Sequence, residues 1–325
     1  MKKNSFPLIA ALTTLLLLPA ESFGEGLITR HFLEVAHVHV NKLDKKKYYA
    51  DECEHIIGIP YVENGHERQV IDVYYAKENR KDAVLIEIHG GFYTTTPRQN
   101  HRKFVSEFLK EGFDVVLLEY RLVDGVHFDI SDQLADCAAA VDYIYLHADS
   151  LHLNKDRMFL TGNSSGAHLA LYTAEGSVDK TMPIHCEFFR TQGVLLNCPA
   201  YDYAAFNDTW FFTKDALEWF IGPRYRDRDW LMEMSPRTHF RNYHGPLFVS
   251  TSRKDFLRMQ AMVLVGDCYI LDRTVDFVHI ESKHSKTGHV HNVNHPEVEE
   301  SKEVNAKMVE FMNRVLEAQN SELKL

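Results

Sequence analysis

Short β-rich runs alternate with helical stretches along most of this 325-residue chain. Seven runs are predicted as strands, and they cover residues 70–77, 83–90, 113–120, 157–163, 193–198, 246–251 and 274–281. Parallel strands need crossover connections, which are usually helices, and such strands are buried on both faces. The alternation therefore predicts an α/β fold with a mostly parallel central sheet and helices on both of its faces.

Two of the connecting stretches have a clear helical period. Apolar residues recur at three- and four-residue steps between Ile130 and Tyr145. A last helix is predicted to open with Pro296 in its first turn, and its buried face is expected at Val304, Met308, Phe311, Met312 and Val315.

Two regions interrupt the alternation. Residues 27–50 precede the first predicted strand, and residues 199–245 form an insertion rich in Tyr, Phe and Trp. The rings of the insertion are expected to pack as a small satellite core. They are also placed to form a cap, because open α/β sheets bind ligands at the carboxyl ends of their strands.

The N-terminus has the features of a secretory signal. Lys2 and Lys3 precede the apolar run 6–19, and the small residues Ala20 and Ser22 follow it. Residues 1–24 are thus predicted as a signal peptide of an exported protein, with residues 25–325 as the folded domain; an uncleaved anchor is the alternative. No other segment is apolar enough to span a bilayer, so no membrane association is expected after cleavage.

Charge and cysteine content narrow the possible partners. The net charge is −10 and the chain has no Lys/Arg-rich block, so nucleic acid is not expected as a partner. The five cysteines are widely spaced and include no C-x-x-C pair, so they are expected to be buried apolar residues. One disulfide bond between two of them is the alternative.

The stretch Gly162-Asn163-Ser164-Ser165-Gly166 matches G-x-S-x-G at the end of a predicted strand and the start of a predicted helix. In that context the motif forms a sharp turn with its central serine exposed. Ser164 is therefore the candidate nucleophile, with Ser165 as the alternative. The Ser165 backbone N–H, free at the helix start, is a candidate oxyanion donor.

A second signal follows the strand at 83–90. His89-Gly90-Gly91 resembles an oxyanion loop in which residues without side chains let backbone N–H groups approach a substrate carbonyl. The alternative is an ordinary turn. We expect Gly90 and Gly91 to donate to the oxyanion together with Ser165.

These motifs, with "LLEYRL" at 117–122 and "DCAAAVDYI" at 136–144, resemble the α/β-hydrolase superfamily over about residues 55–315. The resemblance is to hormone-sensitive-lipase-like and acetyl-xylan or feruloyl-type esterases. It implies the α/β-hydrolase fold with a small cap, whose elements are expected at about residues 27–50 and 199–245. The family often has G-D-S-A-G-G where this chain has G-N-S-S-G-A.

The resemblance also implies an acid and a base that follow the serine in the chain. Asp255 is the only carboxylate in the loop after the strand at 246–251. The base should follow the last strand, where the family has an H-x-aromatic step. The histidine of that step aligns with His289, so His289 is the candidate base and His291 is the alternative. His284 and His295 lie in the same loop. A metal site that includes His289 and His291 is a further alternative, but no metal and no cofactor are expected.

The expected function is that of a serine carboxylesterase for short-chain acyl esters, including acetylated or feruloylated carbohydrate. Ser164, His289 and Asp255 are its predicted catalytic residues. An aryl-formamidase-like amidase, a peptidase of the same fold and a non-catalytic binding module stay as alternatives.

Overall fold

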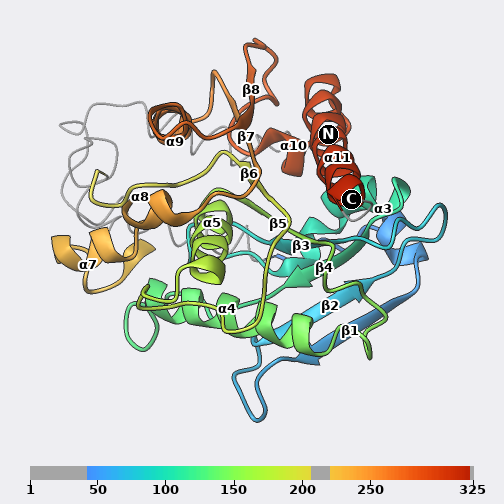
Figure 1. Ribbon diagram of the computed structural model, residues 1–325, viewed down its shortest axis with the longest axis horizontal. Coiled ribbons are helices and arrows are strands. Elements are labelled where there is room, and N and C mark those ends of the chain that lie inside the picture. The colour runs from blue at the N-terminus through green and yellow to red at the C-terminus, as the bar shows by residue number, and fades with distance from the viewer. Residues whose placement is uncertain (1–41, 206–219, 323–325) are drawn as a thin grey trace, which may run out of the picture.

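The computed structural model describes residues 42–205 and 220–322, and eight strands in this part form one sheet (Figure 1). Their order across the sheet is β1-β2-β4-β3-β5-β6-β7-β8. The strands are β1 (His55–Pro60), β2 (Val70–Tyr74), β3 (Val84–Ile88), β4 (Asp114–Leu118), β5 (Met158–Asn163), β6 (Val194–Asn197), β7 (Leu247–Ser252) and β8 (Val275–Ile280).

All neighbouring strands from β4 to β8 are parallel, whereas β2 pairs antiparallel with both β1 and β4. All seven predicted strands are present, so the α/β-hydrolase fold is confirmed. The strand β1 was not predicted. It lies at the sheet edge with mostly exposed residues, and Gly58 and Pro60 weaken its β signal.

Helices and short helical turns cover both faces of the sheet (Figure 1). One hydrophobic cluster joins the sheet to α4, α5 and α9, and the other joins it to α3 and α11. The elements are η2 (Tyr49–Glu52), η3 (Arg98–His101), α3 (Arg102–Lys110), α4 (Ile130–Leu146), α5 (Ser165–Val178), α7 (Arg228–Glu233), α8 (Pro236–His239), η5 (Phe240–Asn242), α9 (Arg258–Ile270), α10 (His291–Asn294) and α11 (Glu299–Glu322).

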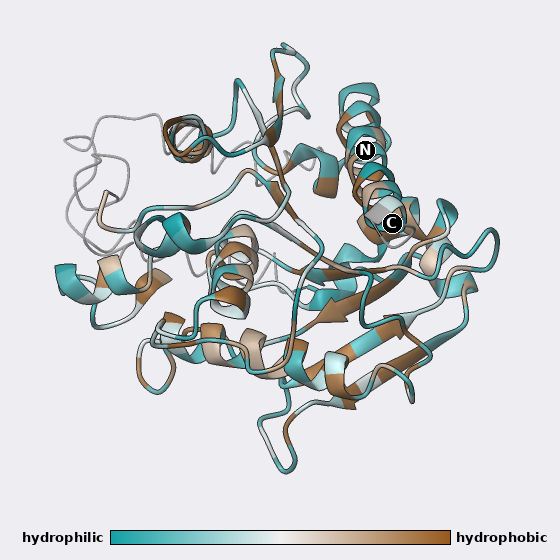
Figure 2. Cartoon of the chain, in the orientation of Figure 1, coloured by the Kyte–Doolittle hydropathy of each residue, from teal (hydrophilic) through white to brown (hydrophobic). Residues whose placement is uncertain are grey.

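Burial on both faces explains the apolar character of the central strands, which Figure 2 shows mainly in brown. Every residue of β3, β4 and β5 is buried, and alternate side chains enter the two clusters. A sheet of this kind holds the carboxyl ends of its strands rigidly, so the first residues of the loops that follow them are held in position as well.

The last helix begins later than the sequence indicates. We expected Pro296 in its first turn, but α11 begins at Glu299. Its start is displaced because the Val298 N–H donates to the His295 carbonyl, which closes a tight turn before the helix. The expected face is otherwise correct: Val304, Met308, Phe311 and Met312 are buried.

The two interrupting regions are described only in part. Residues 42–52 pack beside α3, where the Ala50 N–H donates to Ser106 Oγ at 3.0 Å. The predicted signal peptide at 1–24, the first part of the region 27–50 and residues 206–219 of the insertion lie outside the described residues.

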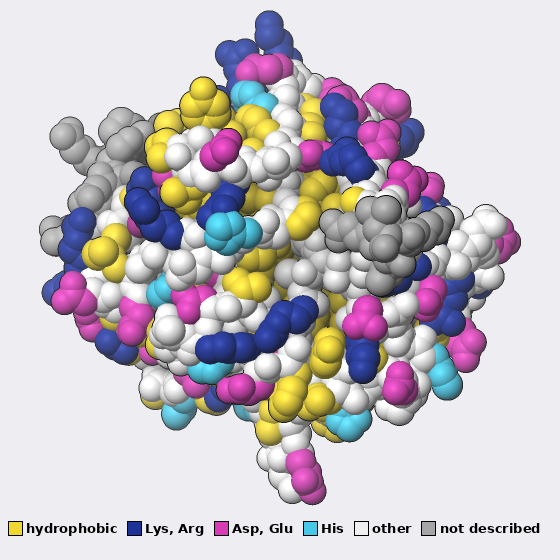
Figure 3. Space-filling model, viewed as in Figure 1, with side chains coloured by type: hydrophobic (Ala, Val, Ile, Leu, Met, Phe, Trp, Pro, Cys, Tyr) yellow, Lys and Arg dark blue, Asp and Glu magenta, His cyan; other side chains and the backbone are white. Residues whose placement is uncertain are grey.

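All five cysteines are buried and unpaired, as expected for apolar core residues. Within the described ranges, no helix has the length and apolar character that crossing a membrane would require. Figure 3 shows acidic and basic side chains interspersed on the visible face, with apolar side chains gathered over α9, where Met259, Met262, Tyr269 and Ile270 are exposed.

Candidate active site

Ser164 occupies the turn between the central strand β5 and helix α5. Its backbone is strained, with φ 56° and ψ −123°, in a region that residues with side chains rarely adopt. The flanking glycines are needed because the backbone is crowded: a Cβ on Gly162 would lie 2.2 Å from the Gly166 carbonyl oxygen, and one on Gly166 would lie 2.1 Å from that of Ile88. The turn therefore matches the predicted nucleophile elbow in geometry.

His289 lies in the loop after β8 and contacts Ser164 across a sequence separation of 125 residues. Its Nε2 lies 2.9 Å from Ser164 Oγ, and its Nδ1 lies 2.6 Å from Asp255 Oδ1. The next residue, Val290, has the left-handed φ of 48°, and its N–H donates to Cys198 Sγ at 3.2 Å. This strained residue and its hydrogen bond fix the position of the loop that carries His289.

Asp255 follows β7 and is buried. Thr251 Oγ1 donates to its Oδ2 at 2.6 Å, and the Leu257 N–H donates to Oδ1 at 2.9 Å. Burial alone would raise the pKa of Asp255, but the charge and hydrogen bond of His289 and the bonds from Thr251 and Leu257 hold it below its usual value. An ionised Asp255 keeps Nδ1 of His289 protonated, so Nε2 is free to accept the Ser164 proton.

The other histidines of this loop have different partners. His291 is buried, and its Nδ1 lies 2.8 Å from Ser301 Oγ; burial lowers its pKa to about 4. His284 is exposed, and His295 pairs with Glu297 at 3.5 Å. Of the four, His289 alone is brought to Ser164 and Asp255, which distinguishes it from His291 on geometry.

The predicted oxyanion donors differ in availability. The Gly90 N–H, a predicted oxyanion donor, is already used in a hydrogen bond to Asn163 Oδ1 at 3.1 Å. The Gly91 and Ser165 N–H groups have no acceptor among the described residues. A Cβ on Gly90 would lie 3.2 Å from Ser164 Cβ, so this loop is in direct contact with the elbow.

An apolar pocket of about 380 Å³, its open mouth included, lies beside Ser164. Phe256 borders it with its ring centroid 4.0 Å from that of His289, and Phe92 stacks on Phe220 at 4.7 Å. The described residues that line the pocket are Phe92, Tyr93, Ser164, Ser165, Ala200, Tyr203, Phe220, Ile221, Phe256 and Leu257. Four of them belong to the insertion at 199–245, so its described part borders the pocket.

Cys198 was not predicted at this site. Its Sγ, one Asp255 oxygen and one His289 nitrogen lie within 4.8 Å of one another, a potential metal-ligand set in the described part of the chain. Burial, and next the Asp255 carboxylate, raise the pKa of the Cys198 thiol well above its usual value, so it is protonated at neutral pH and a poor ligand. The same His289 and Asp255 are already hydrogen-bonded to each other. Cys198 could not be found from the sequence, because it follows β6 as an isolated small residue with no motif.

A family model matches the sequence of this chain, and several solved structures share its fold. The BD-FAE family model, of the feruloyl-esterase type, matches residues 71–260, which is more than half of the chain. Esterase B from Lactobacillus rhamnosis has a TM-score of 0.75 at 18% identity, and the similarity covers 98% of each chain. A truncated carbohydrate esterase from gut microbiota has a TM-score of 0.65 at 17% identity, over 81% of this chain and 96% of that one.

Sequence similarity to curated proteins is limited in extent. Kynurenine formamidase from Drosophila melanogaster is 22% identical over 143 residues, which is 44% of each protein. The chain spans less than half the length of the curated relatives that it matches. The fold, the elbow and the extent of the family-model match agree, and the chain belongs to the BD-FAE family of α/β hydrolases.

Proposed function

We propose that this protein is a serine carboxylesterase that hydrolyses short-chain acyl esters. The observation that carries the proposal is the continuous hydrogen-bonded chain from Ser164 Oγ through His289 to Asp255, with distances of 2.9 and 2.6 Å. A serine hydroxyl is a weak nucleophile, and a hydrogen-bonded imidazole oriented by a carboxylate is the arrangement that activates it.

The proposed reaction has two stages. His289 Nε2 accepts the Ser164 proton as Oγ attacks the acyl carbonyl, and the protonated imidazole then gives that proton to the leaving alkoxide. Water attacks the resulting acyl-serine with His289 again as the base, which restores Ser164 and releases the acid. Asp255 stays ionised throughout and stabilises the imidazolium that forms in each stage.

The tetrahedral oxyanion needs donors that are in place before the reaction. Gly91 comes directly after Gly90, the loop residue that contacts the elbow, and its N–H has no acceptor among the described residues. The Ser165 N–H is likewise an unpaired donor at the start of α5. We assign these two groups to the oxyanion. We assign Gly90 to holding the loop against Asn163.

The pocket supports a short acyl group. Aromatic rings line much of it, and Phe92, Phe220 and Phe256 leave little enclosed space beside Ser164. Acetyl esters of carbohydrate agree with this lining and with the carbohydrate esterase among the structural neighbours, and a feruloyl ester agrees with the family model.

An amidase activity is the second candidate, because kynurenine formamidase is among the similar proteins and the same serine–histidine pair can cleave a formyl amide. We also propose that the protein is exported, on the strength of the N-terminal sequence pattern alone. The mass of the mature protein recovered from outside the cytoplasm would test export.

Initial rates on p-nitrophenyl acetate, butyrate and decanoate test the proposed activity. Acetylated xylan, a feruloyl ester and an N-formyl arylamide should be tested alongside. We expect turnover of the short esters that Ser164→Ala abolishes in a folded protein. Turnover of the formyl amide at a higher kcat/KM than any ester would replace the esterase proposal with the amidase one.

A further inference from the structure

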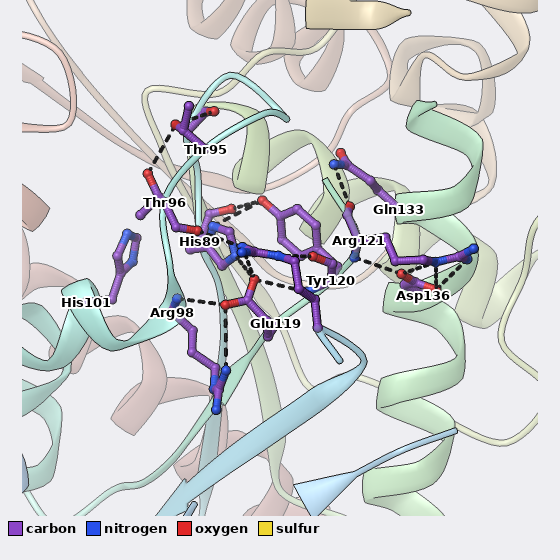
Figure 4. Close-up of polar contacts among 12 residues, drawn as sticks. His89, Thr95, Thr96, Arg98, His101, Glu119, Tyr120, Arg121, Gln133 and Asp136 are labelled. Atoms are coloured by element: carbon purple, nitrogen blue, oxygen red, sulfur yellow. Dashed lines mark hydrogen bonds and ion pairs between the residues drawn. The ribbon is translucent and has the colours of Figure 1, made fainter. Parts of the chain in front are cut away.

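The His89 imidazole lies behind the predicted oxyanion loop and is fully buried, with 0% exposure. Figure 4 shows it between Glu119 and Tyr120. Its Nε2 lies 2.9 Å from Glu119 Oε1, and its Nδ1 lies 2.8 Å from the carbonyl oxygen of Gly90. Both ring nitrogens therefore face oxygen atoms, and the protonation state of the ring depends on what those oxygens can donate.

Glu119 has no proton to give to Nε2. Arg68 Nη2 donates to its Oε1 at 2.5 Å, and the Arg98 N–H donates to its Oε2 at 3.1 Å. Burial alone would raise the pKa of Glu119, but His89, Arg68 and the Arg98 N–H lower it to about 2. The carboxylate is ionised at neutral pH, so Nε2 carries a hydrogen.

Nδ1 also lacks a donor. The Tyr120 hydroxyl lies 3.3 Å from Nδ1 but 2.5 Å from the carbonyl oxygen of His89. A carbonyl can only accept, so the single hydroxyl proton of Tyr120 is used there. Nδ1 then faces acceptors alone among the described residues, and it must carry a hydrogen as well.

We propose that His89 is a stable imidazolium that polarises the Gly90–Gly91 peptide and strengthens the Gly91 N–H as an oxyanion donor. The Gly90 C=O and the Gly91 N–H belong to one planar trans unit and point in opposite directions. A cation that donates to the carbonyl draws electron density from the unit and leaves its N–H more positive. The inference rests on the proposed function, and it makes His89 a positioning residue that does not touch substrate.

Titratable and charged groups at five places in the chain form the network around His89 and its partners. Tyr120 stacks on His89 with centroids 4.3 Å apart, and His101 lies edge-on at 6.0 Å. The titratable and charged neighbours are Arg68 before β2, Asp72 on β2, Glu87 on β3, Arg98 and His101 in η3, and Glu119 and Tyr120 after β4. Asp72 pairs with Arg98 at 2.7 Å, and Glu87 with His101 at 2.7 Å, so Glu119 is the carboxylate in contact with His89.

Histidine-selective ¹⁵N NMR of the full chain tests the charge without reference to activity. The spectrum of His89→Gln identifies the His89 signals. We expect both His89 nitrogens to have the shifts and attached protons of an imidazolium at pH 7. A single protonated nitrogen at pH 7 would overturn the proposal, even if the protein proves to be an efficient esterase.

Kinetics of Glu119→Gln test the consequence for the oxyanion. A neutral amide removes the charge that holds the imidazolium. We therefore expect kcat for p-nitrophenyl acetate to fall by about 10- to 100-fold, while KM stays within two-fold of wild type. This decrease in kcat is smaller than the decrease caused by losing a whole oxyanion donor. Glu119→Asp, which keeps the charge, should recover part of kcat.

Glu87→Gln is the matched control, because it removes a carboxylate from the equally buried pair with His101 that makes no hydrogen bond to the loop. Its kcat should stay within two-fold of wild type. Equal losses of kcat in the two variants, or an unchanged kcat in folded Glu119→Gln, would contradict the proposal. If Glu119→Gln does not fold, the NMR experiment on the wild-type chain still decides the charge. If the wild type cleaves no ester, the proposed function fails separately.

Discussion

The site and its surroundings hold two histidine–carboxylate pairs, His289–Asp255 and His89–Glu119, and they differ in what the second ring nitrogen contacts. In the pair His289–Asp255 that nitrogen lies 2.9 Å from a hydroxyl, which can give up a proton. In the pair His89–Glu119 it lies 2.8 Å from a carbonyl, which cannot. The two pairs have similar nitrogen–oxygen distances to their carboxylates, 2.6 and 2.9 Å.

The difference shows that a carboxylate beside a histidine does not by itself make a base. A carboxylate favours the charged ring in both pairs. The hydroxyl partner lets His289 alternate between two protonation states, whereas the carbonyl partner keeps His89 in one state. On this account the first pair moves protons and the second supplies a fixed positive charge.

The largest expected effect comes from removing the nucleophile. Ser164→Ala should lower kcat by a factor on the order of 10⁴ or more, because no other group can form the acyl intermediate. Steady-state kinetics with an unchanged circular dichroism spectrum would show this. Ser165→Ala is the control: it keeps the backbone N–H and should retain most activity, and the reverse result would move the nucleophile to Ser165.

Removing the charge of each carboxylate separates the two pairs. Asp255→Asn should lower kcat by about 10⁴-fold, since an amide stabilises the wrong tautomer of His289. The corresponding loss for Glu119→Gln is the smaller one given above. Side-by-side kcat values on p-nitrophenyl acetate test the ranking, and a larger loss in Glu119→Gln than in Asp255→Asn would reverse the roles of the pairs.

The acyl-chain preference is expected to be a smaller effect. Acetyl and butyryl esters should exceed the decanoyl ester in kcat/KM by about 10-fold or more, because aromatic rings close the pocket beside Ser164. Phe220→Ala should reduce this ratio by enlarging the pocket. An optimum at octanoyl or longer in the wild type would mean that the pocket continues past its described lining.

The smallest effect on turnover is expected for His291→Ala. The ring is buried against Ser301 and contacts neither Ser164 nor Asp255 in the hydrogen-bond network. Thermal unfolding should show a loss of stability, while kcat of the folded protein stays within a few-fold of wild type. An inactive, fully folded His291→Ala variant would show that the base is not His289 alone.

Acid stability gives a separate measure of the second pair. The folded-state pKa of Glu119, about 2, lies below its unfolded value of about 4.3, so its ionisation stabilises the fold above that value. This stability is lost as pH falls from about 5 towards 2. Urea midpoints of Glu119→Gln should therefore fall less steeply over that range than those of wild type or of the surface control Glu63→Gln. If the urea midpoints of all three proteins fall in parallel with pH, the His89–Glu119 pair does not contribute to the pH dependence of stability.

Much of the site could be predicted from local sequence. The elbow glycines, the strand before Ser164 and the loops after β7 and β8 are each recognisable within about ten residues, and the fixed order of a parallel sheet brings the loops together. The assignment of Asp255 and His289 came from the resemblance to the α/β-hydrolase superfamily, which implies an acid and then a base after the serine.

The groups around His89 could not be predicted in this way. Glu119 follows an apolar strand, and its partners Arg68 and Arg98 are 51 and 21 residues away. The left-handed backbone of Cys198 and Val290 also has no local signal, since valine disfavours that conformation and tertiary contacts impose it. Long-range polar contacts and imposed strain are the parts of the site that depend on the whole fold.

Labelling with an ester-analogue phosphonate, followed by intact mass and peptide mapping, tests the central contrast most directly. We predict one adduct, on Ser164, in the wild type. His289→Gln should label at least 10³-fold more slowly, because the base is lost, and His89→Gln about 10- to 100-fold more slowly, because only the oxyanion donor is weakened. An adduct on Ser165, or wild-type labelling of Ser164 in His289→Gln, would contradict the account.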